Sequence, residues 1–269
     1  MKQKVVAIIQ GRMSSSRLPK KILADISGQP MLSRVMIRAS RAKTLDQIIF
    51  ATTTDASDDP VAEYCDFAGL DFTRGSLYDV LDRYYQTALQ AKADIVVRIT
   101  ADCPVIDPDL IDDVVNTLLE DEYDFVCNRL PHQRTYPIGL DVEACTFKAL
   151  KKVWKSAKEP QHREHVMPYF YEGVQLSVIS RQLSVGESPR GYKIALLNHV
   201  TDFGDYRWTV DTPEDLEFMR EVYKRFNGRD DFTWQEVLDL VHDNPELAKI
   251  NANVQHKTLK DIDKRALKK

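Results

Sequence analysis

The chain has 269 residues, 43% of them hydrophobic and 29% charged, which is enough for a sizeable core in one large domain or in one domain with an appendage. Its net charge is −4, so no global basic field predicts a nucleic-acid partner. No apolar run approaches the length of a membrane span, and the N-terminus shows no signal-peptide pattern, so we expect a cytoplasmic protein without a membrane partner. The four scattered cysteines form no Cys-x-x-Cys pair, which indicates reduced, mostly buried thiols.

A basic loop follows the first predicted strand, residues 5–9, whose short apolar run indicates burial. The loop holds three consecutive serines and four cations, namely Arg12, Arg17, Lys20 and Lys21. Open α/β sheets bind ligands in such loops, and arginine and lysine bind phosphate. Neither common glycine fingerprint of nucleotide sites is present, so phosphates would be bound mainly by side-chain cations. The loop can be a polyanion site or a solvated basic loop. The charges alone favour the solvated basic loop.

Helical and strand patterns alternate along the next part of the chain. We expect a helix at residues 31–42, a strand at 47–52, a helix at 61–69, a weak edge strand at 70–73 and a further helix with Ser76 as its N-cap.

The clearest predicted strand covers residues 94–100, because its apolar residues are nearly continuous, as in a central parallel strand. Asp102 follows it, braced by Pro104. A carboxylate just past a central strand can hold Mg²⁺, which needs one or two carboxylates in addition to water and phosphate oxygens. It can equally be an aspartate that caps a loop, and the residues alone weigh the two interpretations equally.

The remaining patterns extend the alternation to most of the chain. They predict helices at 110–120, 147–158, 216–226 and 234–242 and strands at 124–128, 192–197 and 208–210, with a charged tail from residue 251. Thr212 is the expected cap of the third helix, whose first position is Pro213. The class is therefore α/β with a mainly parallel sheet, and residues 226–269 form a helical C-terminal appendage.

Two polar clusters in the middle of the chain are candidate binding residues. Asp141 and Glu143 alternate along an extended segment, so both can face one side and bind sugar hydroxyls or accept a proton; a salt-bridged surface hairpin is the alternative. His162 and His165 are three residues apart on one predicted helix face. The pattern is not His-Glu-x-x-His and no third ligand is evident, so we do not expect a metal there.

The basic loop resembles a family motif. Its sequence, Gln-Gly-Arg-Met-Ser-Ser-Ser-Arg-Leu-Pro-Lys-Lys, is similar to the opening motif of the sugar cytidylyltransferases, Q-A-R-M-x-S-x-R-L-P-G-K, and is nearest to the spore-coat-polysaccharide cytidylyltransferase-like family. Relatives of that family activate acidic sugars such as sialic acid and Kdo. Gly11 replaces the usual alanine, and Lys20 replaces the usual glycine. We expect the second change to alter the loop, because lysine tolerates positive φ poorly.

Further motifs of the same family follow in the expected order, so that the resemblance covers about residues 4 to 220. They are Arg-Gly-Ser at 74–76, Arg-Ile-Thr-Ala-Asp-Cys-Pro at 98–104, Tyr-Pro-x-Gly-x-Asp-x-Glu at 136–143, His-x-Glu-His-Val at 162–166 and Arg-x-Thr-x-Asp-Thr-x-Glu-Asp-Leu at 207–216. In the fourth motif, Met167 replaces the threonine that usually follows.

The resemblance implies a Rossmann-like nucleotide-diphospho-sugar transferase fold in residues 1–225, with residues 130–175 as a flap for the acceptor and for a homodimer contact. It implies transfer of CMP from CTP to an acidic sugar or related anionic acceptor, with release of pyrophosphate, in polysaccharide biosynthesis. Mg²⁺ would be held by Asp102 and Asp211, which with Arg12 and Lys21 form the catalytic set. Nucleotide binding is implied for Gln10, Gly11, Arg12, Ser14, Arg17, Lys21, Arg74, Gly75, Ser76, Thr100 and Ala101, and acceptor binding for Asp141, Glu143, His162, Arg163 and His165.

Three alternatives remain open. One is a phosphonate or a sugar phosphate as the acceptor. Another is a glycosyltransferase of similar fold, which usually has an Asp-x-Asp metal motif; Asp107-Pro108-Asp109 is the nearby candidate, and it resembles a helix start. The third is a non-catalytic nucleotide- or sugar-binding partner in a polysaccharide assembly complex.

Overall fold

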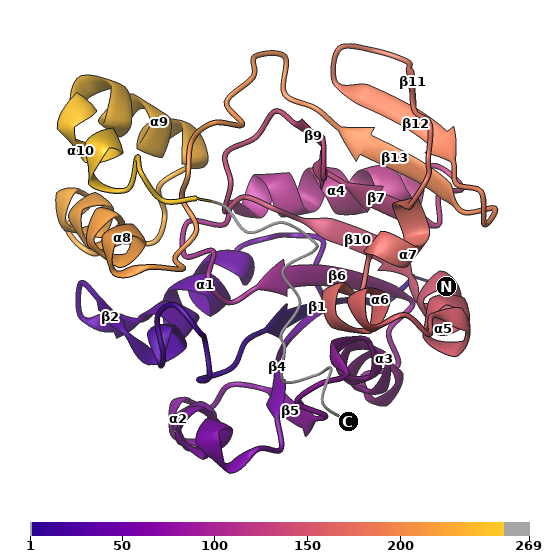
Figure 1. The fold of residues 1–269 in the computed structure, drawn as a ribbon, viewed down its shortest axis with the longest axis horizontal. Helices are drawn as coiled ribbons and strands as arrows, with labels where there is room; N and C mark the ends of the chain where they lie inside the picture. Colours follow the sequence, from indigo (N-terminus) through magenta and orange to yellow (C-terminus); the bar gives the residue numbers. More distant parts are fainter. Residues whose placement is uncertain (1, 256–269) are drawn as a thin grey trace.

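The computed structural model describes residues 2–255, and within this range a nine-stranded mixed sheet is flanked by helices (Figure 1). The strand order is β11-β12-β13-β7-β10-β6-β1-β4-β5. The strands are β1 (Val5–Gln10), β4 (Gln47–Thr53), β5 (Phe72–Gly75), β6 (Ile95–Thr100), β7 (Phe125–Cys127), β10 (Glu143–Thr146), β11 (Ser177–Val178), β12 (Leu183–Glu187) and β13 (Lys193–Leu197). The predicted α/β class with helices flanking the sheet is confirmed, and the sheet, predicted to be mainly parallel, contains antiparallel pairs at β10 and β12 as well.

The half of the sheet that carries the basic loop is entirely parallel. Strand β1 pairs in parallel with β4 on one side and with β6 on the other, and β4 pairs in parallel with β5. Beyond β6 the direction changes, because β10 is antiparallel to both β6 and β7. Gln10 lies opposite Thr100 in the register of β1 and β6, so both strands end at the same edge of the sheet.

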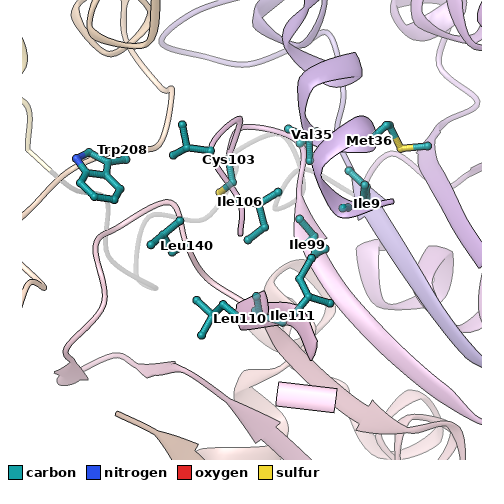
Figure 2. Packing of buried hydrophobic residues seen from close by; sticks show 14 of the residues in the cluster. Ile9, Val35, Met36, Ile99, Cys103, Ile106, Leu110, Ile111, Leu140 and Trp208 are labelled. Atoms are coloured by element: carbon teal, nitrogen blue, oxygen red, sulfur yellow. The ribbon is translucent and has the colours of Figure 1, made fainter. Parts of the chain in front are cut away.

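Helices cover both faces of the sheet, as the nearly continuous apolar sequence of β1 requires. Alternate residues of β1 enter two separate buried clusters: Ile9 lies in one and Ile8 in the other. Figure 2 shows the first cluster, in which Ile9 and Ile99 lie near Val35 and Ile111 from the helices. The helices are α1 (Met31–Ala39), α2 (Asp59–Ala68), α3 (Val80–Gln90), α4 (Pro108–Glu120), α5 (Phe147–Ser156), α6 (Pro160–His165) and α7 (Pro168–Tyr171).

Three helices gather at one end of the molecule: α8 (Pro213–Arg225), α9 (Trp234–Asp243) and α10 (Pro245–Ile250) (Figure 1). Thr212 caps α8 through a capping box with Asp215, which confirms the predicted cap. The domain boundary after residue 225 and the homodimer stay predictions, and the predicted tail beyond residue 255 lies outside the described residues. No helix within residues 2–255 is long and apolar enough to cross a membrane.

Small elements complete the described chain. Two further two-stranded sheets within it are β2 (Asp25–Ile26) with β3 (Gln29–Pro30), and β8 (Arg129–Leu130) with β9 (Gln133–Arg134). Single 3-10 turns, η1 (Lys21–Leu23) and η2 (Ala56–Asp58), follow the basic loop and β4.

Two local predictions are wrong. Ser76 is not the N-cap of α3: Asp79 caps it, and the Ser76 hydroxyl accepts from the backbone N–H groups of Tyr78 and Asp79 in the turn before it. Residues 208–210 form no strand, because their backbone bonds go to loops instead. Trp208 N donates to Ile138 O at 2.6 Å, and Val210 N donates to Asp102 O at 2.8 Å.

Gly139 makes this docking possible. It has φ of +108°, and a Cβ atom on it would lie 2.5 Å from the backbone carbon of Trp208. The neighbouring Ile138 N donates to Tyr206 O at 2.8 Å, so the two segments run in direct backbone contact. Only glycine permits both the positive φ and this approach, and the contact fixes the chain that leads into Asp211.

We expect Gly139→Ala to destabilise the protein by about 3 kcal/mol or more, because it combines positive-φ strain with a clash against backbone that has no room to move. Gly191→Ala is the matched control, since Gly191 has φ of +78° but a Cβ there would meet only Glu187 Oε1 at 3.9 Å. The control should lose only about 1 kcal/mol. Urea unfolding of both variants measures the difference, and equal losses would contradict the assigned backbone contact.

Candidate active site

The basic loop is held to the sheet by backbone and by one buried carboxylate. Lys20 takes the left-handed conformation that glycine favours, with φ of 65°, and its N–H donates to Met13 O at 2.8 Å. Met13 N in turn donates to Asp58 Oδ1 at 2.6 Å, and Thr53 donates its hydroxyl to the same buried carboxylate. Asp58 thus positions the loop, a role that its place near a helix start did not predict.

Lys21 lies at the centre of the site. Its ammonium donates to Asp102 Oδ2 at 2.7 Å, to Val210 O at 2.7 Å and to Asp211 Oδ1 at 2.9 Å, so each of its three N–H groups has an acceptor. Burial alone lowers the pKa of Lys21, but the two carboxylates outweigh it and raise this pKa above its usual value. The ammonium is therefore charged and brings the two aspartates together, while their predicted role in holding Mg²⁺ stays a prediction.

The second oxygen of Asp211 faces two arginines. Arg17 Nη2 lies 2.8 Å and Arg207 Nη2 3.1 Å from Asp211 Oδ2. Burial alone raises the pKa of Asp211, but Lys21 and these guanidinium groups hold it well below its usual range. Asp211 is thus an ionised carboxylate in a cationic setting.

A cavity of about 200 Å³ opens beside these charges. It is lined by Gln10, Gly11, Arg12, Ser15, Ser16, Arg17, Lys21, Ile22, Thr100, Ala101, Asp102 and Asp211. These include most of the residues predicted for the nucleotide and all four predicted as catalytic. Gly11 lets the loop approach β6 closely, since a Cβ on it would lie 2.7 Å from Ala101 Cβ. Ser14 is not in the lining, whereas Ser15 and Ser16 are.

Arg74, Gly75 and Ser76 lie outside this cavity lining. The Arg74 guanidinium donates to Thr53 O at 2.7 Å and to Asp59 Oδ1 at 2.6 Å, which ties β5 to the start of α2. A Cβ on Gly75 would lie 2.7 Å from Arg83 Cγ, so this position must be small. The nucleotide-binding role of these three residues stays a prediction.

A second cavity of about 150 Å³ shares Gln10 and Arg12 with the first and therefore adjoins it. Its other lining residues are Leu77, Tyr78, Val80, Arg98, Glu164 and His165. Arg98 was missed from the sequence, although a charged residue within an otherwise apolar central strand is a visible signal. It forms an ion pair with Glu143, which is buried.

His165 enters this cavity from the end of α6, beside a strained turn. The next residue, Val166, is fully buried with φ of 69° and ψ of −62°, and Met167 N donates to His165 O at 2.8 Å across it. A positive φ is rare for a β-branched residue and costs on the order of 1–3 kcal/mol. The surrounding packing therefore enforces the position of His165.

The other predicted acceptor residues are engaged in structural contacts and do not line either cavity. Asp141 binds Arg134, whose Nη2 donates to Asp141 Oδ2 at 2.8 Å, and it also pairs with Arg129 at 3.1 Å. Arg163 pairs with Asp79 at the start of α3. His162 is buried, with Nε2 3.2 Å from Glu172 Oε2. Their contact with an acceptor, like that of Glu143, stays a prediction.

The donor set around Lys21 suits a hard divalent cation. It consists of two carboxylates and a backbone carbonyl, and Mg²⁺ prefers such oxygen ligands. The described residues contain no cluster of three or more His, Cys, Asp or Glu side chains that would form a complete metal cage. Mg²⁺ usually takes one or two carboxylates and completes its sphere with water and substrate phosphates, and its place on Asp102 and Asp211 stays a prediction.

Comparisons with known proteins identify the family of the chain. The model of the family described as Cytidylyltransferase matches residues 6–244. The chain is 34% identical over 262 residues to an uncharacterised protein of Methanocaldococcus jannaschii. The matched region covers 97% of this chain and 99% of that protein. It is 28% identical over 253 residues to the spore coat polysaccharide biosynthesis protein SpsF of Bacillus subtilis, with 91% and 96% covered.

A solved structure of a cytidylyltransferase from Leptospira borgpetersenii is also similar. Its TM-score is 0.83 at 29% identity, over 95% of this chain and 100% of that one. The resemblance predicted from the motifs is thereby confirmed: the chain belongs to the cytidylyltransferase family.

Proposed function

We propose that the protein transfers CMP from CTP to a small anionic acceptor, with release of pyrophosphate and in dependence on Mg²⁺. The observation that carries this proposal is the pair of carboxylates, Asp102 and Asp211, that share one ammonium in the lining of a cavity with further cations. Membership of the cytidylyltransferase family supports the reaction class.

The side chains assign the parts of the reaction. Arg12, Arg17 and Lys21 line the first cavity and neutralise the triphosphate and the departing pyrophosphate. The acceptor occupies the adjoining cavity, from which its oxygen attacks the α-phosphorus in line. Such transfers depend on positioning and charge neutralisation more than on covalent catalysis. A divalent cation on the two aspartates, when bound, supplies further neutralisation of the phosphate oxygens.

The second cavity favours an anionic acceptor. Its lining holds two guanidinium groups, of Arg12 and Arg98, against one carboxylate, of Glu164, and Tyr78 can donate a hydrogen bond. Arg98 is already paired with Glu143, so Arg12 is the main cation offered to the acceptor. SpsF is named for spore coat polysaccharide biosynthesis, which supports an acidic sugar of a surface glycan as the acceptor. The same cationic side chains would also bind a phosphonate, which is the alternative acceptor.

Lys21 has to leave the two carboxylates before they can bind a divalent cation, because it occupies the position between them. The phosphates of an incoming nucleotide give its ammonium another anionic partner in the same cavity. The nucleotide therefore binds together with the cation or before it.

Nothing in the described site favours the glycosyltransferase alternative. The Asp107 carboxylate is buried and accepts from the N–H groups of Asp109 and Leu110, so it caps α4. It also accepts from Trp234 N at 2.9 Å. These contacts are structural, as the helix-start interpretation of Asp107-Pro108-Asp109 predicts.

The proposal is tested by pyrophosphate release with Mg²⁺, using each of the four ribonucleoside triphosphates against a panel of acidic sugars and phosphonates. We expect release with CTP and one class of acceptor. Release with another nucleotide alone would overturn the base assignment and keep the mechanism. Binding of CTP in calorimetry without release for any acceptor would instead support the nucleotide-binding partner.

We expect Asp102→Ala and Asp211→Ala each to lower kcat about a hundredfold or more, on the order of 3 kcal/mol, because each removes a preorganised charge. Asp109→Ala is the control: this exposed aspartate follows the same strand but lies outside both cavity linings. It should keep kcat within about twofold, since surface substitutions away from a site have small effects. Initial rates of pyrophosphate release check this, and wild-type rates in either site variant would exclude the assigned centre.

Without nucleotide, Lys21→Met should bind Mn²⁺ at least about tenfold more tightly than the wild type, a change of about 1.4 kcal/mol, because the competing ammonium is gone. Lys20→Met removes the same charge from the adjacent exposed position and should bind Mn²⁺ like the wild type. Electron paramagnetic resonance of free Mn²⁺ gives both affinities, with circular dichroism as the check on folding. Equal affinities in all three proteins would refute the exchange.

A further inference from the structure

The segment that follows α10 contacts the Asp211 side of the site, although none of the family motifs reaches it. Asn251 directly follows α10 and is buried, with 6% of its surface exposed. Its Nδ2 donates to Arg207 O at 3.0 Å and to Asp215 Oδ1 at 3.0 Å. The segment after the C-terminal helices therefore contributes the side-chain amide of Asn251 to the hydrogen-bond network around Asp211.

Asp215 is the link between Asn251 and Asp211. Its carboxylate is fully buried and accepts from Arg207 Nε and Nη2, both at 2.9 Å. It also accepts from the backbone N–H groups of Asp211 at 3.0 Å and of Thr212 at 3.1 Å. The main chain of Asp211 is thus fixed by Asp215, and Asn251 supplies one of the donors that hold this buried charge.

Arg207 provides a second route to the same carboxylate. Its backbone carbonyl accepts from Asn251, and its Nη2 lies 3.1 Å from Asp211 Oδ2. Loss of the Asn251 amide would leave the Arg207 carbonyl and one Asp215 oxygen with fewer partners in a buried place. Both groups bear directly on the orientation of Asp211.

The same segment reaches the other arginine of Asp211. Arg17 Nη1 donates to Gln255 O at 3.3 Å, while its Nη2 pairs with Asp211 at 2.8 Å. Residues 251–255 therefore contact both arginines that face the second oxygen of Asp211, Arg207 through its backbone carbonyl and Arg17 through its guanidinium.

The C-terminal helices share one buried apolar cluster with the sheet, and polar contacts and a cavity lie beside that cluster. A cavity of about 330 Å³ lies between the C-terminal helices and the sheet domain, lined by Arg207, Trp208, Phe218, Val241 and Asn251 among others. Tyr206 Oη and His242 Nε2, 2.8 Å apart, add a contact from α9. Asn251 lines this cavity, and its two hydrogen bonds join the segment to Arg207 and Asp215 there.

We propose that Asn251 is a positioning residue for Asp211, which makes the C-terminal helices part of the catalytic machinery. The proposal rests on the proposed role of Asp211 as a ligand of the divalent cation. Asn251 does not touch the substrate or the cation; it acts through Asp215 and Arg207.

The test compares Asn251→Ala, Asn251→Asp and Asn244→Ala. Asn244 lies among the same C-terminal helices, and within residues 2–255 its side-chain amide donates to Leu240 O of α9 at 2.8 Å. Partners of this kind typically contribute tenfold to a hundredfold to metal affinity. With CTP present and no acceptor, we expect Asn251→Ala to bind Mn²⁺ about tenfold more weakly than the wild type. Asn251→Asp should lose more, since it cannot donate and adds a charge beside Asp215.

The readouts separate a positioning role from a merely structural one. Mn²⁺ affinity is measured by electron paramagnetic resonance well below the unfolding temperature of each variant, and kcat and the KM for CTP are measured alongside. Asn244→Ala should match the wild type in all three quantities. Wild-type Mn²⁺ affinity in Asn251→Ala, while Asp211→Ala loses it, would overturn this inference alone. Unchanged affinity in Asp211→Ala would overturn the metal role of Asp211 and, with it, this inference.

Discussion

The contact on which the site depends is the ammonium of Lys21 between Asp102, Asp211 and the carbonyl of Val210. Two carboxylates so close together repel each other, and partial burial strengthens that repulsion. The ammonium between them offsets this repulsion, and Arg17 and Arg207 offset more of it at Asp211. In the proposed function, a divalent cation takes over this role once the ammonium has moved to phosphate.

Three segments that are distant in sequence have to meet for this contact to form. The parallel register of β1 and β6 places the basic loop beside Asp102. Asp211 arrives differently, on an extended segment that is docked against Gly139 and the backbone of Asp102. The C-terminal helices then hold that segment from the outer side through Asn251. The site is thus supported by the sheet on one side and by side-chain hydrogen bonds on the other.

The sequence predicted the parts of the site that local patterns carry. Asp102 follows a nearly continuous apolar strand, and Thr212 and Asp215 form a recognisable capping box. It did not predict Asp58, because the bond from Met13 to its carboxylate spans 45 residues and leaves no local pattern. Asn251 was missed for the same reason. Ser76 was misassigned as a cap because serine bonds to the backbone equally well in the turn before a helix.

The sharpest test of the account is diffraction at the manganese absorption edge from crystals grown with CTP and Mn²⁺. We expect an anomalous peak within coordination distance of carboxylate oxygens of both Asp102 and Asp211, with the Lys21 ammonium moved onto the phosphates. A peak that touches neither aspartate, with Lys21 still between them, would contradict it.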